Sequence, residues 1–167
     1  MAPQSLRPVI RTADLSGSDP AGVSAAVGEY LRQTDAEKHS EGLAPPLDHE
    51  GLLPERYRAE VDDPAAAYAG LRVLLAEVAG VVAGVVVVSV HAGAAEIKRL
   101  WAAPDVRGRG IGSALLDAAV AVVDGDVRLS VWDWRAGAIG LYESRGFVRV
   151  PRWDGRERLV CMIRPAR

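Results

Sequence analysis

Apolar positions along the chain follow two spacings, one typical of helices and one typical of strands. After the turn residues 17–20, apolar side chains recur every three or four positions, which predicts a helix with Asp19 as its N-cap and Pro20 as its first residue. A second repeat of this kind begins at Ile111 and ends at Gly125. We therefore expect helices on both sides of a β-rich centre.

The centre of the chain is rich in β-branched residues. Residues 71–78 and 81–90 are joined by Ala79 and Gly80, which predicts an antiparallel hairpin. The second run is nearly all valine, so we expect both of its faces to be buried. Further strands are expected at 9–12, 96–101, 127–132, 147–150 and 157–163, further helices at 52–60 and 136–145, and a loop at 39–50.

This order places antiparallel strands first and a β-α-β-α-β run after them. The predicted fold class is therefore α/β (α+β), with a mixed sheet flanked by helices. The length of 167 residues suits one domain, and 49% apolar with 25% charged residues is the usual mix of a globular protein. We expect a single domain over 1–167, with a variable region at 1–65 and a core at 71–164.

Cysteine content and hydropathy bear on the compartment. Cys161 is the only cysteine, so an internal disulfide is excluded and a reducing compartment is expected. Residues 1–7 lack the pattern of a signal peptide, and the longest apolar run, 78–89, is too short to span a bilayer. We expect a cytoplasmic protein that does not insert into a membrane.

Charge is distributed unevenly, although the net charge is −2. Residues 98–167 hold thirteen Lys or Arg and eight Asp or Glu, whereas residues 1–97 hold seven and fourteen. This division indicates either two ligands of opposite charge or a chance surface composition. Basic residues interleaved with aromatic ones are not found, so we do not expect nucleic acid as a partner.

A glycine-rich segment lies between an expected strand and an expected helix. Gly108, Gly110 and Gly112 let the backbone approach a ligand closely. The helix start behind them offers unpaired N–H groups, while Arg107 and Arg109 add positive charge and Ser113 a hydroxyl. The segment therefore predicts a phosphate or pyrophosphate site, with a solvated glycine turn as the alternative.

Two other nucleotide-binding motifs fit less well. The dinucleotide fingerprint G-x-G-x-x-G has its first two glycines at Gly108 and Gly110, but its third position is Ser113. The expected β-α repeats after it would need more than the remaining residues, and an antiparallel hairpin precedes it. A Walker A loop is excluded because no Gly-Lys-Ser/Thr follows the glycines.

Three motifs in order resemble the GCN5-related N-acetyltransferase (GNAT) superfamily. Residues 107–112 resemble its Q/R-x-x-G-x-G/A signature, residues 96–101 its fourth strand, and residues 138–147 its A-I-x-L-Y-x-x-x-G-F signature. The resemblance covers residues 71–150. It implies a mostly antiparallel central sheet with splayed central strands, acetyl-CoA as co-substrate, no metal, and an amine acceptor. Dimers are common in the family, so a homodimer is expected.

The resemblance also implies which residues contact acetyl-CoA. Its carbonyl would be polarised by backbone N–H groups near a bulge in the segment Leu100 to Ala102. Where the family often has an asparagine, this chain has Arg135, which either meets a phosphate of coenzyme A or faces solvent. The full predicted set is Leu100, Trp101, Ala102, Arg107, Gly108, Arg109, Gly110, Ile111, Gly112, Ser113, Arg135 and Tyr142.

Two residues are the candidate catalytic groups. The resemblance implies that Tyr142 protonates the departing thiolate; its structural alternative is packing beside Ile139. Glu96 is the candidate general base, since few alkylamines are neutral at pH 7. Its alternative is an ion pair with Lys98, and Glu77 and His91 are weaker candidates.

The acceptor is less defined by sequence. If the acidic N-terminal part lines the acceptor side, it favours a small cationic amine or a peptide amine. The acidic residues in question are Asp35, Glu37, Glu41, Asp48, Glu50, Glu55, Glu60, Asp62 and Asp63. The rival interpretation is a non-catalytic module that senses acyl-CoA and needs neither Tyr142 nor Glu96.

Overall fold

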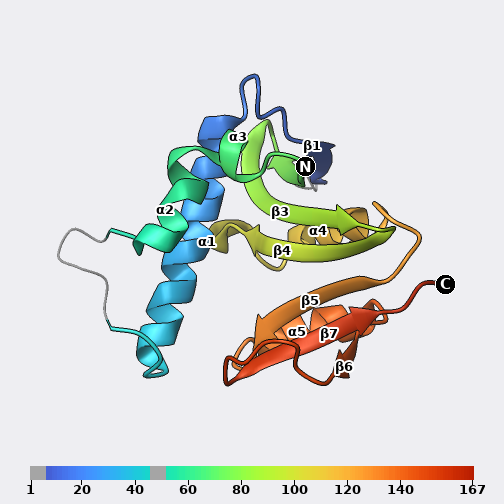
Figure 1. Cartoon of the computed structure of the whole chain (residues 1–167). Coiled ribbons are helices and arrows are strands. Elements are labelled where there is room, and N and C mark those ends of the chain that lie inside the picture. The colour runs from blue at the N-terminus through green and yellow to red at the C-terminus, as the bar shows by residue number, and fades with distance from the viewer. Residues whose placement is uncertain (1–6, 46–51) are drawn as a thin grey trace, which may run out of the picture.

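The computed structural model describes residues 7–45 and 52–167, and its strands form one seven-stranded sheet. The spatial order is β1-β2-β3-β4-β5-β7-β6 (Figure 1). The pairing of β4 with β5 is parallel and the other pairings are antiparallel. The strands are β1 (Val9–Thr12), β2 (Arg72–Val78), β3 (Val81–His91), β4 (Ala94–Ala102), β5 (Val127–Trp132), β6 (Val148–Val150) and β7 (Leu159–Arg164). The predicted mixed, mostly antiparallel sheet is confirmed.

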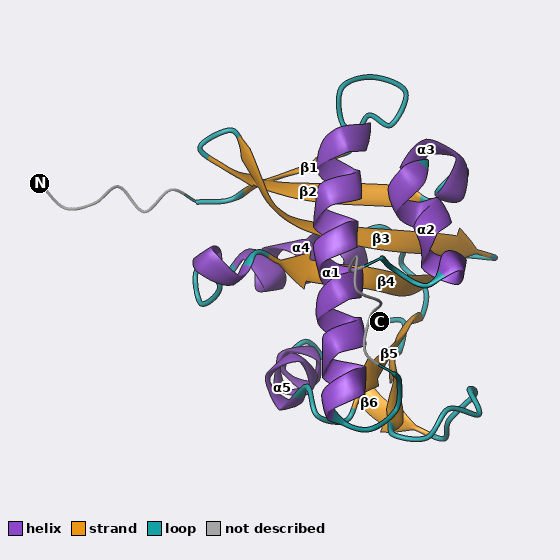
Figure 2. Cartoon of the chain, turned by 90° about the vertical axis from the view of Figure 1, so that its left-hand side faces the viewer, coloured by secondary structure: helices purple, strands orange, loops and turns teal. Residues whose placement is uncertain are grey.

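Helices cover both faces of this sheet (Figure 2). On one face, α4 and α5 pack on the strand residues of one alternation, including Val86 and Val88. On the other, α1 packs on the opposite alternation, including Val85 and Val87. The predicted burial of both faces is confirmed for residues 83–88 of the valine run, whereas Val81 and Val90 at its ends are exposed. The helices are α1 (Pro20–Ser40), α2 (Glu55–Asp62), α3 (Pro64–Ala67), a 3₁₀ turn η1 (Pro104–Val106), α4 (Ile111–Val120) and α5 (Ala136–Ser144).

The sheet opens between its two central strands. β4 pairs with β5 at two positions, Ala95 with Val127 and Glu96 with Arg128. Beyond them the strands separate toward α1, which lies across the open end (Figures 1 and 2). On its other edge β4 has a bulge, because Arg99 and Leu100 stand opposite the single β3 residue Val86, and Arg99 has φ 54°. The predicted splay is present, and the bulge begins one residue before the predicted segment.

Several predicted boundaries were wrong for local reasons. α1 continues through His39 and Ser40. Basic residues are favourable near the negative end of the helix dipole, and Lys38 and His39 lie in the last turn. The loop expected at 39–50 therefore begins at Glu41, and its residues 46–50 lie outside the described part. α2 begins at Glu55 rather than 52, because a residue before proline avoids helical ψ and Leu53 precedes Pro54. The closing strand begins at Leu159, after Arg158 with φ 66°.

Asp19 occupies the predicted N-cap position of α1, but its side chain does not cap the helix. Its carboxylate accepts no hydrogen bond from the first turn of α1. It instead binds the Arg11 guanidinium at 2.7 Å and the Asp14 N–H at 2.6 Å. These bonds hold its pKa at about 2, with the Arg11 hydrogen bond contributing most. Arg11 also binds Glu77, so this cluster fixes the start of α1 beside β1 and β2.

Gly84 lets α4 approach the bulged part of β4, and its replacement by alanine is expected to destabilise the fold. An added Cβ would lie 2.8 Å from the Trp101 carbonyl oxygen and 2.9 Å from Leu115 Cδ1. We expect Gly84→Ala to lower the free energy of unfolding by about 1–3 kcal/mol in urea denaturation. The matched control is Gly140→Ala on α5, where no atom lies within 4 Å and helix propensity predicts an unchanged or higher stability. Equal stability of the two variants would contradict this account.

Candidate active site

The glycine loop forms the N-terminal approach to α4. Gly108 and Gly110 both have φ 79°, a left-handed conformation that favours glycine. No protein atom lies within 4 Å of a Cβ added at either position, so the space beside the loop is open. Gly110 is the N-cap of α4 and no side chain caps this end. The first N–H groups of α4 are therefore available to an anion.

A cleft of about 880 Å³ extends from this loop between β4, α4, α5 and α1. Arg107 stands at its edge, where its guanidinium donates to the Ala102 carbonyl at 3.0 Å and to Gln33 Oε1 at 2.6 Å. The end of β4 and the start of α5 form its walls. Of the twelve residues predicted to contact acetyl-CoA, eleven line this cleft: Leu100, Trp101, Ala102, Arg107, Gly108, Gly110, Ile111, Gly112, Ser113, Arg135 and Tyr142. Arg109 is exposed and does not line it.

A second cavity of about 270 Å³ lies between the separated strands β4 and β5, under α1. It contains residues of β4 from Glu96 to Leu100 and of β5 from Leu129 to Trp132. Four residues line both spaces: Tyr30, Leu100, Arg135 and Tyr142. The inter-strand cavity and the glycine-loop cleft therefore meet at the point where the sheet opens.

Tyr142 is the titratable side chain at this junction that is the candidate proton donor. Its ring packs against Phe147 with centroids 5.8 Å apart, so the packing role is present as well. Its hydroxyl has no hydrogen-bond partner among the described residues, and the residue lines both spaces. Burial raises the pKa of Tyr142 well above its ordinary value, and the charge of Tyr30 adds to this. The phenol therefore keeps its proton at neutral pH and is suited to donate it.

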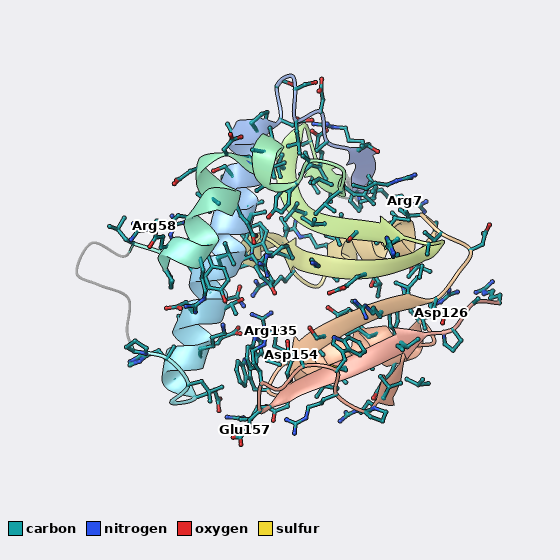
Figure 3. All side chains as sticks on the ribbon, viewed as in Figure 1. Arg7, Arg58, Asp126, Arg135, Asp154 and Glu157 are labelled. Carbon is teal, nitrogen blue, oxygen red and sulfur yellow. The ribbon has the colours of Figure 1, made fainter. Side chains whose placement is uncertain are left out.

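Arg135 connects α1 to the start of α5. Its guanidinium binds Glu37 at 2.8 Å and Thr34 Oγ1 at 2.8 Å, and it lies 5.4 Å from the Tyr30 ring centroid. Figure 3 shows Arg135 beside α1, at the opening between the two parts of the sheet. Burial alone would raise the pKa of Glu37, but hydrogen bonds from Gln33 and Trp134 and the Arg135 charge hold it below the ordinary value. Arg135 is thus mostly shielded from solvent and is ion-paired with Glu37.

Glu96 lies at the closed end of the inter-strand cavity. Its carboxylate binds the Arg128 guanidinium across the parallel pairing, at 2.9 Å, rather than Lys98. It remains part of the cavity lining and partly exposed. The two weaker candidates lie elsewhere: Glu77 binds Arg11, and His91 is exposed at the end of β3. Glu96 is therefore the one of the three that borders the cavity.

A family model described as the acetyltransferase (GNAT) family matches residues 33–147, more than half of the chain. The chain belongs to the GNAT acetyltransferase family. The match includes the glycine loop and Tyr142, and it begins inside α1. No curated protein sequence matches the chain significantly.

Solved GNAT structures share its fold over nearly the whole length. PaiA N-acetyltransferase from Thermoplasma acidophilum, solved with coenzyme A, has a TM-score of 0.69 and 20% identity over 95% of this chain and 98% of its own. The ribosomal-protein-S18-alanine N-acetyltransferase of Escherichia coli has a TM-score of 0.65 and 20% identity over 95% and 94%. A GNAT acetyltransferase from Staphylococcus aureus MU50 has a TM-score of 0.68 and 14% identity over 96% and 99%.

Sequence reasoning offered Asp35 and Glu37 of α1 as acceptor-side acids but missed the other residues that this helix contributes to the GNAT site. Tyr30, Gln33 and Glu37 line the glycine-loop cleft, and Thr34, Asp35 and Lys38 line the inter-strand cavity. The apolar spacing that predicted the helix stopped at Leu31. Continuing the same period through polar residues would have placed Thr34, Asp35 and Lys38 on the same face.

Within residues 7–45 and 52–167, no three His, Cys, Asp or Glu side chains are grouped as a metal site would need. Over the same residues, every helix is too short or too polar to cross a lipid bilayer.

Replacing Gly110 by alanine is expected to weaken binding of acetyl-CoA far more than it weakens the fold. The left-handed backbone would cost about 1–2 kcal/mol, and the new methyl would enter the open space beside the loop. We expect the Kd from isothermal titration calorimetry to rise at least about 10-fold. Gly80→Ala is the matched control, because Gly80 has φ 77° and open space but lies in the β2–β3 turn. An unchanged Kd in the Gly110 variant would exclude the loop as the phosphate site.

Proposed function

We propose that this protein is an N-acetyltransferase that moves the acetyl group of acetyl-CoA onto a primary amine of a small molecule or peptide. The observation that carries the proposal is the junction at Tyr142, where a cleft that starts at an uncapped helix N-terminus meets a cavity between splayed strands. The cleft suits a long phosphorylated co-substrate, and the cavity suits the acceptor.

The residues of the cleft fit coenzyme A by their chemistry. N–H groups at the start of α4 and the loop glycines would hold the pyrophosphate, with Arg107 beside them. Beyond Glu96, no strand pairs with the β5-facing edge of β4 in the described part of the chain. N–H groups of the Leu100–Ala102 segment can therefore polarise the acetyl carbonyl. Arg135 is proposed as a contact at the narrow point between the two spaces.

The reaction defines what the side chains must do. A bond forms between the acceptor nitrogen and the acetyl carbonyl carbon, and the bond from that carbon to sulfur breaks. One proton must leave the nitrogen and one must reach the sulfur. We assign the second proton to Tyr142, whose buried phenol keeps its proton until the thiolate develops. We assign the first to Glu96, directly or through water, because its carboxylate borders the cavity.

The rival function is a GNAT-like module that binds acyl-CoA without turnover. It would use the same cleft, so binding alone does not separate the two functions. The observation against it is that Tyr142 lines both spaces and its hydroxyl has no hydrogen-bond partner among the described residues, whereas a purely structural ring would be served equally by phenylalanine.

The first expected outcome concerns binding. Acetyl-CoA at about 100 times its Kd adds roughly 2.7 kcal/mol to stability, which for this length raises Tm by about 5–11 °C. We expect this shift in thermal unfolding with acetyl-CoA and none with NADH. A shift with NADH alone would assign the glycine loop to a dinucleotide and end the acetyltransferase proposal.

The second expected outcome separates enzyme from sensor. Tyr142→Phe should lower kcat at least about 100-fold, because the thiolate loses its proton donor. Stability should change little, since the lost hydroxyl has no hydrogen-bond partner among the described residues. Thiol release measures kcat, and the Kd for acetyl-CoA should stay within about 3-fold as the internal control. Full activity of the variant would remove Tyr142 from the mechanism.

A further inference from the structure

The buried face of α1 changes character halfway along the helix. Its buried positions keep a helical period throughout, but they are apolar or small as far as Leu31 and polar afterwards. The apolar half packs against β2 and β3. The later buried residues, Thr34, Asp35 and Lys38, line the inter-strand cavity instead. A helix that served packing alone would continue its apolar stripe here.

Asp35 is a buried carboxylate with no side-chain partner among the described residues. The residue is 5% exposed and lines the cavity. Among the described residues, it accepts no side-chain hydrogen bond and forms no ion pair, in contrast to its neighbour Glu37. Burial of a charged group is unfavourable unless it is paired. Among the described residues, no cation of the cavity lining forms an ion pair with the Asp35 carboxylate, which is therefore left for a ligand.

Lys38 is the complementary case, one helical turn away. It is 8% exposed, and its Nζ lies 3.3 Å from the Tyr57 hydroxyl and 5.1 Å from the Trp132 ring centroid. No carboxylate forms an ion pair with it in the part of the chain that the structure describes. The aromatic faces stabilise its charge in part. This ammonium therefore lacks an anion.

The other charges of the cavity are neutralised or solvated. Each of four side chains in its lining has a partner outside the cavity: Arg99 with Glu60, Arg135 with Glu37, Arg156 with Asp154 and Glu96 with Arg128. Lys98 is exposed to solvent. Asp35 and Lys38 thus remain as the two buried charges that require a ligand.

We infer that the inter-strand cavity selects a small amino acid as acceptor, with Asp35 binding the reacting ammonium and Lys38 the carboxylate. The inference rests on the proposed function and names its substrate class. Side chains three residues apart on a helix are neighbours, with Cβ atoms about 5–6 Å apart. This spacing suits the ammonium nitrogen and the carboxylate carbon of an α-amino acid, which are two bonds apart. The amine bound by Asp35 must still lose one proton before it attacks, and water in the cavity can carry that proton to Glu96 at the closed end.

Size and charge disfavour the other amine classes. A cavity of about 270 Å³ lies below the roughly 300 Å³ at which pockets for drug-sized ligands begin. A polyamine would place a second cation against Lys38, and a peptide N-terminus has an amide where the carboxylate should be. Some of the acidic residues that favoured a cationic or peptide amine in the sequence are used in ion pairs instead, as in Arg158–Glu41.

The test uses acceptors that differ by one group. Purified protein with acetyl-CoA is assayed for thiol release with the common α-amino acids, their α-amides and the corresponding decarboxylated amines. Binding of the same compounds is measured by calorimetry in the presence of coenzyme A. We expect at least one amino acid to have a kcat/KM at least about 10-fold above that of its amide and amine, the ratio expected when Lys38 is left without an anion.

Two variants assign the charges. Lys38→Met should reduce the preference for amino acid over amide to about 1, while activity on the amide is kept. Asp35→Asn should raise KM and the acceptor Kd for all amines at least about 10-fold. The matched controls, Glu29→Gln and Arg32→Met, lie on the outer face of α1, where these side chains are 63% and 47% exposed, and should leave both quantities unchanged.

The outcomes separate the two proposals. If acetyl-CoA does not bind, the proposed function fails. If acetyl-CoA binds but amides and amines react at the same rate as amino acids, the cavity is not an amino-acid site. The same conclusion follows if acetyl-CoA binds but none of the three classes is acetylated or bound. The same holds if Lys38→Met keeps the preference. Loss of the preference in Lys38→Met with intact binding of acetyl-CoA supports the inference.

Discussion

The short pairing between β4 and β5 is the constraint on which the rest of the structure depends. Two residue pairs join the strands, and beyond Glu96 and Arg128 they separate. A parallel pairing that continued would have covered the backbone of β4 and filled the space under α1. Because it stops, β4 keeps a backbone edge beyond Glu96 with which no strand of the described residues pairs, and this edge borders the cavity that Tyr142 also lines. Both spaces of the site exist because this ladder is interrupted.

Ion pairs replace the missing ladder as the connection between the two parts of the sheet. Glu37 of α1 binds Arg135 and Trp134 on the β5 side, and Glu41, directly after α1, binds Arg158 before β7. In most of these pairs the acid comes from the acidic N-terminal part and the arginine from the basic C-terminal part. Part of the charge asymmetry of the sequence therefore reflects internal contacts, since four ion pairs join an acid of residues 1–97 to an arginine of residues 98–167: Glu37–Arg135, Glu41–Arg158, Glu60–Arg99 and Glu96–Arg128.

The sequence predicted the features that depend on local spacing. Alternating and helical periods located β5 without error and most other elements to within a few residues, and the glycines of the loop lie where the cleft begins. The bulge at Arg99 could not be placed, because a left-handed φ at an arginine has no residue signal of the kind glycine provides. Nor could the contacts of α1 with β4 and α5, since they join residues about 65 to 100 positions apart and no local pattern encodes such a separation. Proline rules, applied to Leu53 and Pro54, would have corrected the start of α2.

The polar end of α1 shows why the helix could not be optimised for stability alone. Leucine at positions 35 and 38 would extend the apolar face of the helix and remove two buried charges, which in many proteins is neutral or stabilising. It would also place apolar side chains in the one space that reaches Tyr142 from the side opposite the glycine loop. Keeping Asp35 and Lys38 there leaves the cavity open and charged, at a cost in stability that packing at the apolar half, Val23 to Leu31, offsets. The first half of α1 thus stabilises the fold and its second half lines the site. Both halves must face the same side of the helix, and the uninterrupted helical period of the buried positions meets this need.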